Sequence, residues 1–467
     1  MGPFKLLIDG KLEDGDAVMN VINPANEEVL AECPRASKAQ LDKAVAAAKR
    51  AFPAWAAKPI DERRAALNAM ADAIQGDLQN LARILTQEQG KPLADAMGEV
   101  YGAAAFFRYF ATLDLPEKVI EDSPSRKVIS RRRPLGVVGA IVPWNFPLIL
   151  MAFKIPAALL AGNTVILKPA ATTPLSTLRI AELVKDLLPP GVLNVIADAN
   201  DLGGAITAHP DIRKVSFTGS TETGKKVMAG AAEALKRVTL ELGGNDAAIV
   251  LDGVDPTETA GKIFAGAFQN SGQVCIAIKR AYVHESVYDA MCDELARLAD
   301  AAVMGDGLQQ GVTVGPLQNK AQFDKVLGFI EAGRQDGKII AGGARGEGKG
   351  YFIRPTIVRD ITDGSRLVDE EQFGPVLPVI KIKDGEDALT RANASPYGLG
   401  GSIWSKDLDV AMELAGRMDT GTVWINKHAE LAPNIPFGGA KMSGLGTELG
   451  EEGLSEFTQM HVINMAR

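Results

Sequence analysis

The sequence predicts an α/β protein with a doubly wound sheet, followed by a second α/β unit. Between residues 137 and 243, short apolar strands alternate with helical stretches of about a dozen residues, which is the pattern of parallel βαβ units. A second alternating series begins near Asp246. A doubly wound sheet holds nucleotides beyond the carboxyl ends of its strands. Because 467 residues exceed what one ordinary core accommodates, we expect two or three domains.

The composition is typical of a globular protein in a reducing compartment. Hydrophobic residues make up 46% and charged residues 23% of the chain, and the net charge of −8 argues against general nucleic-acid binding. No run approaches ~18 apolar residues, and the N-terminal apolar run is too short for a secretory signal, so we expect neither membrane insertion nor export. Three cysteines are too few for a disulfide framework, which favours the cytoplasm. The four histidines lack ligand spacing, so we expect no metal site.

Helical periodicity dominates the first part of the chain. Residues 37–56 begin with a capping Ser37 and place apolar side chains on one face. One longer helix is expected after Asp61, because its apolar residues recur every three or four positions. These residues are Leu67, Met70, Ile74, Leu78, Leu81 and Leu85. A third helix is expected near residues 95–112.

Strands become frequent from residue 128. VISRRR predicts an exposed strand whose arginines face solvent, and VVGAIV predicts a fully buried strand. The strands TVILKP, VLNVIA, KVSFTGS and VTLELGG follow, with helices expected at 175–188, 202–208 and 222–235. The terminal HVINMA is apolar enough to be a strand that pairs outside its own domain.

The second α/β series contains the strands AAIVL and AYVHE and helices expected at 257–269 and 286–303. Ser286 and Asp289 suggest a capping box for the later helix, whose Cys292 is expected in the core. The glycine-rich AGGARGEGKGY is expected to connect a hairpin, because no helix follows its glycines. Cys33 is expected in an irregular segment without a partner.

The segment VSFTGSTETGKK, residues 215–226, predicts a phosphate site. A strand ends at Phe217 and a helix starts near Thr221, so free backbone N–H groups and the helix dipole meet at the Gly-Ser turn between them. The spacing nearly forms a P-loop, but Lys226 stands where the magnesium-binding hydroxyl belongs. An NTPase or other P-loop phosphotransferase is therefore disfavoured, whereas a dinucleotide pyrophosphate and an ordinary capped helix both stay open.

Three polar side chains stand out in apolar surroundings. Glu241 closes a buried strand before two glycines, where a carboxylate is unfavourable unless it is hydrogen-bonded or protonated. Asn145, between Trp144 and Phe146, offers an amide donor suited to an oxyanion. Cys275 lies in FQNSGQVCIAIKRAY, after a polar loop that gives a thiolate access. Taken singly, each has an ordinary interpretation: a capping glutamate, a turn-bonding asparagine and a buried filler.

Taken together, these segments resemble the aldehyde dehydrogenase superfamily. PWNFP, KPA…TPL, FTGST, LELGGND, GQVC, EEQFGP and PFGGAKMSGLG occur in the family's order, from about residue 8 to the C-terminus. The resemblance implies a Rossmann-like cofactor-binding domain, residues 1–117 and 134–243, and a catalytic domain, residues 244–442. It also implies a small β oligomerisation arm, residues 118–133 and 456–467, through which a homodimer or homotetramer forms.

The resemblance assigns chemical roles. Cys275 matches the nucleophile that forms a thiohemiacetal and then a thioester. Asn145 and the backbone N–H of Cys275 match the oxyanion hole, and Glu241 matches the base that activates water. Lys154 and Glu448 match a pair that passes the proton onward. The implied reaction oxidises an aldehyde to the carboxylic acid with NAD or NADP and water.

The resemblance also implies a cofactor site. Its residues are Lys168 at the adenine ribose, Gly219 and Ser220 at the pyrophosphate, Glu371 and Phe373 at the nicotinamide ribose and ring, and Trp144 and Ile141 along the cleft. Many NAD-preferring relatives carry a glutamate three residues after the lysine, where this chain has Ala171. The missing repulsion of a 2′-phosphate leaves NADP open beside NAD.

The implied substrate pocket is apolar. Its residues are Phe146, Leu150, Phe153, Leu431 and Phe437. None is basic, so a clamp for a substrate carboxylate is missing and apolar aliphatic or aromatic aldehydes are favoured. His428 and Glu430 are expected to be solvated loop residues.

Two alternatives stay open at this point. A CoA-acylating aldehyde dehydrogenase would pass the acyl group to a thiol, but relatives of that type commonly lack the base that Glu241 matches. A non-catalytic structural or binding member of the superfamily would not need an intact catalytic set. In either case, an exposed strand edge such as HVINMA predicts self-association.

Overall fold

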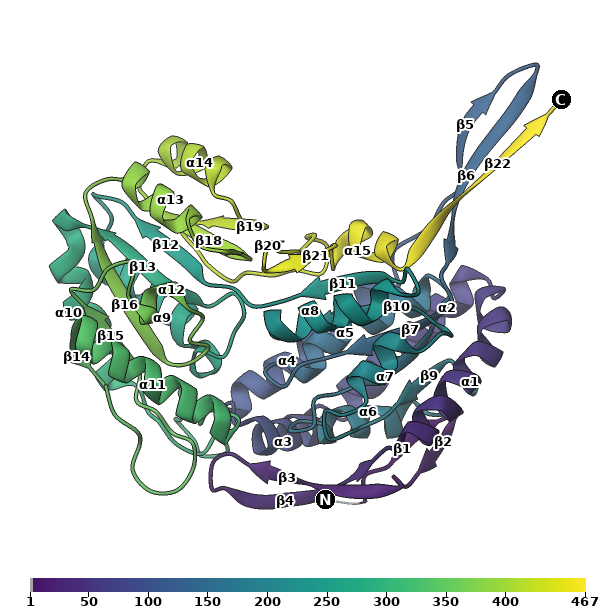
Figure 1. Ribbon diagram of the computed structural model, residues 1–467, viewed down its shortest axis with the longest axis horizontal. Coiled ribbons are helices and arrows are strands. Elements are labelled where there is room, and N and C mark those ends of the chain that lie inside the picture. The colour runs from purple at the N-terminus through teal and green to yellow at the C-terminus, as the bar shows by residue number, and fades with distance from the viewer. Residues whose placement is uncertain (1–2) are drawn as a thin grey trace.

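The computed structural model describes residues 3–467, whose strands form two large sheets and a projecting arm (Figure 1). The first sheet has the order β2-β1-β9-β8-β7-β10-β11-β21 and the second has the order β14-β15-β16-β13-β12-β18-β19. The first-sheet strands are β1 (Leu6–Ile8), β2 (Lys11–Glu13), β7 (Val137–Ile141), β8 (Thr164–Lys168), β9 (Leu193–Val195), β10 (Ile212–Thr218), β11 (Arg237–Glu241) and β21 (Gly444–Leu445). The second-sheet strands are β12 (Asp246–Val250), β13 (Ile278–His284), β14 (Lys338–Ala341), β15 (Thr356–Arg359), β16 (Val376–Ile382), β18 (Gly400–Trp404) and β19 (Thr422–Ile425).

Helices cover both sheets, so the predicted α/β class is confirmed. The helices around the first sheet are α1 (Lys38–Ala56), α2 (Ile60–Gly76), α3 (Leu78–Gln89), α4 (Leu93–Phe110), α5 (Pro147–Leu160), α6 (Leu175–Val184), α7 (Gly203–Ala208), α8 (Thr221–Ala232) and α15 (Gly450–Glu456). Those around the second sheet are α9 (Pro256–Phe268), the 3₁₀ helix η1 (Gln269–Gly272), α10 (Glu285–Ala301), α11 (Lys320–Asp336), α12 (Arg366–Asp369), α13 (Gly385–Asn393) and α14 (Leu408–Arg417). Outside these sheets, β3 (Ala17–Asn23) pairs with β4 (Glu28–Arg35), and β17 (Tyr397–Gly398) pairs with β20 (Ala440–Lys441).

The first sheet is doubly wound, as the alternation of strands and helices predicts. Strands β7 to β11 are all parallel. From β7, the strands β8 and β9 are added on one side of the sheet, and β10 and β11 are added on the other side. The strand order therefore reverses between β7 and β10. A crevice forms at such a reversal, beyond the carboxyl ends of the strands, and it is where sheets of this kind bind nucleotides.

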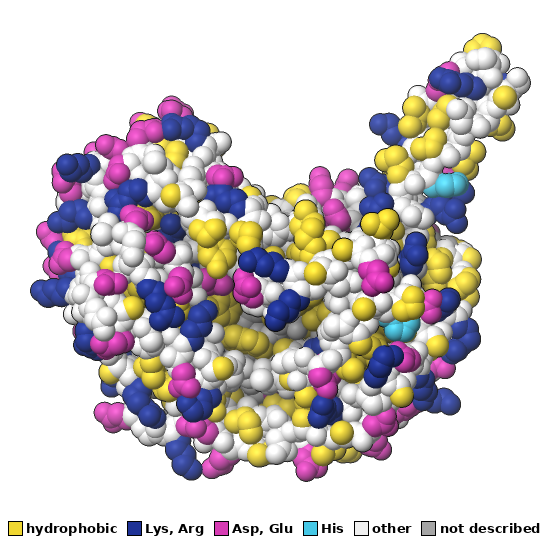
Figure 2. All heavy atoms as spheres, viewed as in Figure 1, with side chains coloured by type: hydrophobic (Ala, Val, Ile, Leu, Met, Phe, Trp, Pro, Cys, Tyr) yellow, Lys and Arg dark blue, Asp and Glu magenta, His cyan; other side chains and the backbone are white. Residues whose placement is uncertain are grey.

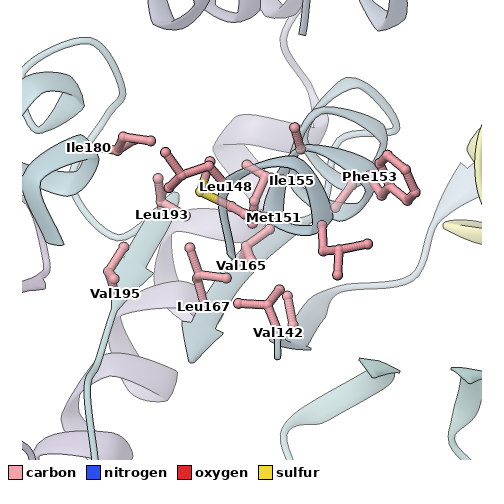
Figure 3. Packing of buried hydrophobic residues seen from close by; sticks show 14 of the residues in the cluster. Val142, Leu148, Met151, Phe153, Ile155, Val165, Leu167, Ile180, Leu193 and Val195 are labelled. Carbon is pink, nitrogen blue, oxygen red and sulfur yellow. The ribbon is translucent and has the colours of Figure 1, made fainter. Parts of the chain in front are cut away.

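The core of the first sheet is built on an almost wholly apolar helix, α5. All its residues except Ile149 are buried, and Figure 3 shows its side chains against those of β8 and β9. The labelled contacts include Leu148, Met151 and Ile155 from the helix, and Val165, Leu167, Leu193 and Val195 from the strands. A helix that is apolar on all sides packs between layers, and this one carries Lys154 in its middle.

The second sheet is buried on both faces. Alternate residues of β12 belong to two separate hydrophobic clusters: Ala247 and Ile249 face one, and Ala248 and Val250 face the other. This explains why AAIVL reads as a continuous apolar run, because parallel strands covered on both faces show no alternation.

Two predictions about helices need correction. The longer helix expected after Asp61 is two helices, since α2 ends at Gly76 and α3 begins at Leu78. The apolar spacing continued across the break because both helices pack on the same core. Asp77 lies at the break, and its carboxylate accepts a hydrogen bond from Arg179 Nε at 2.8 Å. Tertiary contacts of this kind override a periodic pattern.

The capping box predicted from Ser286 and Asp289 is also wrong. Helix α10 begins at Glu285, and its N-cap is His284, whose Nδ1 accepts from the Ser286 N–H at 3.2 Å. Asp289 instead pairs with Arg359. Cys33, expected in an irregular segment, lies in strand β4 and is fully buried. Cys292 is buried in the core, as predicted.

Three antiparallel strands form an arm that projects from the body (Figure 1). They are β5 (Lys118–Asp122), β6 (Arg126–Pro134) and β22 (Thr458–Ala466). The prediction that HVINMA pairs with a distant strand is confirmed, because β22 pairs with β6 from Thr458 opposite Pro134 to Ala466 opposite Arg126. Hydrophobic side chains lie along the arm in Figure 2, and several are more than half exposed. These are Val119, Ile120, Met460, Val462 and Met465.

None of the helices in residues 3–467 combines the length and apolar character needed to cross a bilayer.

Candidate active site

A cleft of about 660 Å³ lies at the strand reversal of the first sheet. Its walls come from the segments that follow β7, β8 and β10 and from α8. Among the residues expected to hold a cofactor, it contains Ile141, Trp144, Lys168, Gly219 and Ser220. The cleft therefore gathers residues that lie far apart in the chain, from Ile141 to Asn319.

Ser220 caps helix α8 at the floor of this cleft. Its hydroxyl accepts from the Thr223 N–H at 3.3 Å, and the helix starts at Thr221. The N–H groups of the first turn and the helix dipole point into the cleft and favour an anion. This geometry fits a pyrophosphate, which the sequence segment 215–226 predicts.

Lys168 lies in the wall of the cleft, and its ammonium group is paired with a carboxylate. Its Nζ is 2.6 Å from Asp198 Oδ1, and both side chains are buried. Asn200 borders the same cleft, and its Oδ1 lies 3.4 Å from the Ala171 N–H. An amide thus occupies the position next to Ala171, so no carboxylate stands there to repel a 2′-phosphate.

Cys275 lies at the inner end of the cleft. It shares a cavity of about 170 Å³ with Trp144, Asn145, Glu371 and Phe373. This cavity also contains Gly219 and Ser220, so it is continuous with the larger cleft. The prediction of a loop position is confirmed, because Cys275 follows η1 and precedes β13.

A left-handed turn brings the cysteine to this place. Asn270, Ser271 and Gly272 have φ values of 48°, 56° and 71° in succession, which reverses the chain just after α9. One local and one distant hydrogen bond hold the turn. Gln273 Nε2 donates to the Asn270 carbonyl at 2.9 Å, and Ser271 Oγ donates to the Gly315 carbonyl of another loop at 2.8 Å. Such strained backbone is typical of functional sites.

A buried lysine lies beneath the cysteine. Lys279 Nζ donates to the carbonyl of Cys275 at 2.6 Å and to that of Val274 at 2.9 Å. It also lies 3.6 Å from Glu371 Oε1, which accepts from the Gly244 N–H at 3.0 Å. Gly244 permits this packing, because a Cβ there would stand 2.7 Å from the Cys275 carbonyl oxygen.

Burial raises the pKa of the Cys275 thiol to about 12. The Lys279 ammonium lowers this pKa, whereas the carboxyl groups of Glu241, Asp246 and Glu371 raise it further. The thiol is therefore protonated at neutral pH in the cofactor-free protein, and it must lose its proton before it can act as a nucleophile.

Asn145 is held against the cysteine loop from both ends. Its Nδ2 donates to the Gln273 carbonyl at 3.0 Å. The backbone carbonyl of Asn145 accepts from Lys91 Nζ at 2.9 Å and from Asn270 Nδ2 at 3.0 Å. Lys91 in turn forms a fully buried ion pair with Glu99. The peptide of Asn145 is thus held in place, and its side-chain amide makes one hydrogen bond, which leaves one of its two N–H groups free of these contacts.

Glu241 closes strand β11, and both its carboxyl oxygens lack a hydrogen-bond partner in the described protein. Burial raises its pKa well above the ordinary value, the charge of Glu448 raises it further, and Lys154 lowers it. Lys154 and Glu448 form a fully buried ion pair. The structure therefore brings together the three residues that the resemblance assigns to proton transfer.

Trp144 and Phe373 close the cleft near the cysteine. Their rings meet edge to face, with centroids 5.4 Å apart. Phe373 is held in a left-handed conformation with φ of 52°, and its carbonyl accepts from Gln322 Nε2 at 2.9 Å. Two loops that are distant in the sequence thus meet at the wall of the inner cavity.

Of the five residues expected to form the substrate pocket, one shares the cavity of the cysteine. Leu150 lines the cavity of Cys275. Phe153 is buried and packs on Phe106 with ring centroids 4.9 Å apart, and Phe146 lies beneath Lys91 Nζ, 3.6 Å from its ring centre. All five belong to or pack against the hydrophobic cluster that Cys275 contacts; the other two are Leu431 and Phe437.

The expectation for His428 is wrong. Its ring is fully buried, stacks near Trp424 with centroids 4.8 Å apart, and bonds the Ile276 carbonyl through Nε2 at 2.7 Å. Burial lowers its pKa to about 3, so the ring stays neutral. Glu430 is exposed, as expected. A single sequence offers no periodic signal in such a loop, because the ring is buried by tertiary contacts alone.

Sequence reasoning missed several buried charges beside the site. They are Lys91, Glu99, Asp198, Lys279 and Lys214. Lys279 had a signal in the sequence, because this lysine follows the apolar residues Ile276 to Ile278 at the start of the buried strand β13. A lysine in such a position is almost never buried without a partner. The others gave no comparable signal, since their burial depends on packing against other parts of the chain.

The fold and the site together define a class of protein. It is an NAD(P)-dependent oxidoreductase with a thiol at the inner end of its cofactor cleft. The chain belongs to the aldehyde dehydrogenase family, whose profile it matches over residues 12–463. Its enzyme class is therefore NAD(P)-dependent oxidation of aldehydes.

Individual relatives cover nearly the whole chain. Aldehyde dehydrogenase, cytosolic 1, of Rattus norvegicus is 41% identical over 455 residues, 95% of this chain and 91% of the relative. An NAD⁺ complex of aldehyde dehydrogenase from Bacillus cereus has a TM-score of 0.97 at 38% identity, over 100% of this chain and 97% of the other. A structure described as an E. coli NADP-dependent enzyme has a TM-score of 0.97 at 36% identity, over 100% and 98% of the two chains.

Proposed function

We propose that the protein oxidises an apolar aldehyde to its carboxylic acid through a thioester on Cys275, with water as the second substrate. The observation that carries this proposal is the cavity shared by Cys275, Asn145 and Glu371, which opens into the cofactor cleft. A nucleophile must be reachable from both the substrate side and the cofactor side, and this cavity meets that requirement.

The roles of the residues follow from their placement. The Cys275 thiolate attacks the aldehyde carbon, and the resulting alkoxide is stabilised by the free N–H of the Asn145 amide and by the Cys275 backbone N–H. When bound, the oxidised nicotinamide supplies the acceptor for the hydride. Glu241 then takes a proton from water, whose oxygen attacks the thioester carbon and releases the acid.

The cleft fits a dinucleotide. The first turn of α8 below Ser220 would hold the pyrophosphate, Lys168 the adenine ribose, and Glu371 with Phe373 the nicotinamide end. The neighbours cited above are described as an NAD⁺ complex and as NADP-dependent. Because Ala171 and Asn200 present no carboxylate, we propose that NAD and NADP are both accepted.

The charges beside the cavity support an apolar substrate. Three buried lysines lie near Cys275 or Glu241, and each is already paired: Lys91 with Glu99, Lys154 with Glu448, and Lys279 with two carbonyls and Glu371. None is free to clamp a substrate carboxylate. A fourth lysine, Lys325, lines the cavity of Cys275, and its Nζ donates to the Glu371 carbonyl at 3.0 Å. The cavity walls also include Trp144, Leu150 and Phe373, so affinity should rise with the hydrocarbon length of the aldehyde, by about 0.8 kcal/mol per buried CH₂.

The test is NADH or NADPH formation with aldehydes of increasing chain length, with and without CoA. We expect turnover without CoA in the wild type and none in Cys275→Ala, whereas Cys292→Ala, a buried thiol away from the cleft, should stay active. Full turnover by Cys275→Ala would contradict the role of the thiol. A wild type that stalls after one turnover until CoA is added would favour the acylating alternative.

We also propose the division of the chain that the resemblance implies. Residues 1–117 and 134–243 would form the cofactor domain, of which residues 1 and 2 lie outside the described part, and residues 244–442 the catalytic domain. Residues 118–133 and 456–467 would form the arm. Because the arm exposes apolar side chains and, apart from Phe457 at its base, contributes to none of the three hydrophobic clusters, we propose that it pairs with another copy to give a homodimer or homotetramer.

For location, we propose the cytoplasm. All three cysteines are free thiols, and the two buried ones lie in different parts of the core. A protein that depends on a reduced nucleophile suits a reducing compartment. Cell fractionation with an antibody to the protein tests this location.

A further inference from the structure

A buried row of polar side chains leads away from Glu241 on one face of the first sheet. Alternate residues of a strand point to the same face, so Glu241 and Thr239 share a face of β11. Their partners on β10 are Thr218 and Ser216, and Lys214 comes next along the same row. All five side chains are buried. Buried polar groups are unfavourable in an apolar core, so such a row requires an explanation.

Hydrogen bonds link Lys214, Ser216 and Thr239 to neighbouring polar groups, whereas the side-chain oxygens of Glu241 and Thr218 have no partner in the described protein. Lys214 Nζ donates to Thr239 Oγ1 at 2.6 Å. Ser216 Oγ donates to Glu448 Oε1 at 3.2 Å, and this carboxylate neighbours Glu241 closely enough to raise its pKa. Ser216 and Thr239 are register partners on adjacent strands. Two hydrogen-bonded pairs, Glu448 with Ser216 and Lys214 with Thr239, therefore lie side by side on adjacent strands, and the strand register brings Ser216 next to Thr239.

The outer end of the row reaches a cavity at the base of the arm. Glu456 Oε2 lies 3.6 Å from Lys214 Nζ, and the Glu456 side chain is 32% exposed whereas that of Lys214 is fully buried. Glu456 lines a cavity of about 510 Å³. The other lining residues are Arg132, Arg237, Thr447, Glu451, Glu452 and Ser455. One carboxylate thus stands between Lys214 and the surface.

The surroundings of Lys214 make its proton exchangeable. Burial lowers the pKa of Lys214 to about 8, the carboxylates of Glu456 and Glu448 raise it, and Lys154 lowers it. Lys214 therefore exists in both charged and neutral forms near neutral pH, unlike a solvated lysine with a pKa of about 10.4. A group in this range can both accept and release a proton.

We propose that this row is the exit path for the proton that hydrolysis of the thioester leaves on Glu241, an inference that rests on the proposed function. As the water oxygen bonds to the thioester carbon, the carbon–sulfur bond breaks and the sulfur leaves as the thiolate. One water proton passes to the Glu241 carboxylate, and the product leaves as the carboxylic acid. Glu241 must lose that proton before the next turnover, and its buried position gives it no direct contact with solvent.

The path runs in order through Glu448, Ser216, Thr239, Lys214 and Glu456 to the cavity at the base of the arm. The pair of Lys154 and Glu448 belongs to what the family resemblance implies. The two hydroxyls, Lys214 and the outlet at Glu456 extend beyond it and direct the proton to the side of the sheet away from the cofactor cleft.

The experiment compares Lys214→Arg, Lys214→Met and Glu456→Gln in the full-length enzyme. Stopped-flow absorbance reports the burst of reduced cofactor, which measures thioester formation, and a pH indicator reports proton release during the slower hydrolysis. Arginine keeps the positive charge but does not release its proton. Lys236→Met is the matched control, because Lys236 is a part-buried lysine that bonds the His209 carbonyl at the edge of the same sheet.

We expect Lys214→Arg and Lys214→Met to slow hydrolysis and proton release by about tenfold, and Glu456→Gln by a smaller factor, with the burst unchanged in all three. In the wild type, the hydrolysis rate should rise with pH as Lys214 loses its proton near pH 8, and this rise should vanish in Lys214→Arg. A purely structural lysine would be replaced by arginine without loss of the pH dependence.

Wild-type hydrolysis and proton release in both Lys214→Arg and Glu456→Gln would overturn the path. If Lys214→Arg does not fold, Glu456→Gln decides alone, and unchanged proton release in it overturns the proposal. Absence of any formation of reduced cofactor by the wild type would instead contradict the proposed function, so the two failures are distinguishable.

Discussion

At the scale of single residues, the site is organised by buried charges that are fully partnered. Lys279 supports the peptide of Cys275, Lys91 supports the peptide of Asn145, and Lys154 neutralises Glu448. An unpaired charge in these positions would be strongly destabilising, whereas a paired one holds its neighbours in a fixed orientation. The reactive groups themselves, Cys275 and Glu241, keep free atoms or lack partners, which is what a reacting group needs.

The pKa of the Cys275 thiol predicts how its reactivity depends on pH. Because this pKa is raised to about 12 in the cofactor-free protein, the thiolate fraction at neutral pH is smaller than in free cysteine and grows about tenfold per pH unit. Alkylation by iodoacetamide should therefore be at least about 100-fold slower than that of glutathione at pH near 8 and should accelerate steadily up to pH near 10.

Mass spectrometry of the intact protein measures this reaction. Cys275→Ala serves as the control, since Cys33 and Cys292 are fully buried and should remain unlabelled in the folded state. A labelling rate that is already maximal at neutral pH would show that the thiol is ionised, against the prediction.

At the scale of elements, the left-handed turn of η1 connects α9 to the strand that carries the site. The chain passes so close to its neighbour that a Cβ on Gly272 would stand 2.3 Å from the Gly374 carbonyl oxygen, at a φ of +71°. Gly374 follows directly on Phe373. The turn thus couples the cysteine loop to the loop expected to hold the nicotinamide.

Gly272→Ala should therefore destabilise the protein by about 2–4 kcal/mol, because it combines left-handed strain with a backbone clash. Gly261→Ala is the matched control in the preceding helix, where a Cβ meets no atom within 4 Å and alanine should be neutral or stabilising by up to about 1 kcal/mol. Urea unfolding of both variants measures the difference. Equal stability of the two would mean that the turn relaxes without cost.

At the scale of the whole molecule, the two large sheets and the arm differ in how their faces are covered. The sheets bury their apolar faces under helices, whereas the arm has only three strands and no helix over either face. A small sheet is stabilised when its hydrophobic face is covered. We propose that a second copy of the chain covers the exposed apolar side chains of the arm, because a symmetric pair presents the same surface on both copies.

Met460→Asp should weaken self-association at least about tenfold, because it places a charge on the exposed apolar surface of β22. Met412→Asp is the matched control, since Met412 is exposed to a similar degree, 65% against 61% for Met460, but lies on α14. Sedimentation velocity across a range of concentrations measures the assembly state. A wild type that stays monomeric, or equal behaviour of the two variants, would contradict the role of the arm.

Much of this architecture could be predicted from the sequence because it depends on local pattern. The βαβ alternation, the capped helix at Ser37, the Gly-Ser turn before α8 and the terminal strand each have a periodic or turn signal in neighbouring residues. The break at Asp77 could not be predicted, because Asp77 bonds Arg179 from a distant part of the chain. The cap at His284 is a local contact with Ser286, but histidine is not among the usual capping residues.

By itself, the sequence determined the fold class and the chemical groups at hand: one accessible thiol, one strand-end carboxylate and one amide between aromatic residues. Tertiary structure alone decided which side chains meet them. The contacts of Lys91 with Asn145 and of Lys279 with Glu371, and the row from Glu448 to Lys214, come together through sheet register and loop packing between segments that are distant in the chain. Burial changes the proton affinity of these groups, and burial is a property of the assembled core rather than of any local stretch.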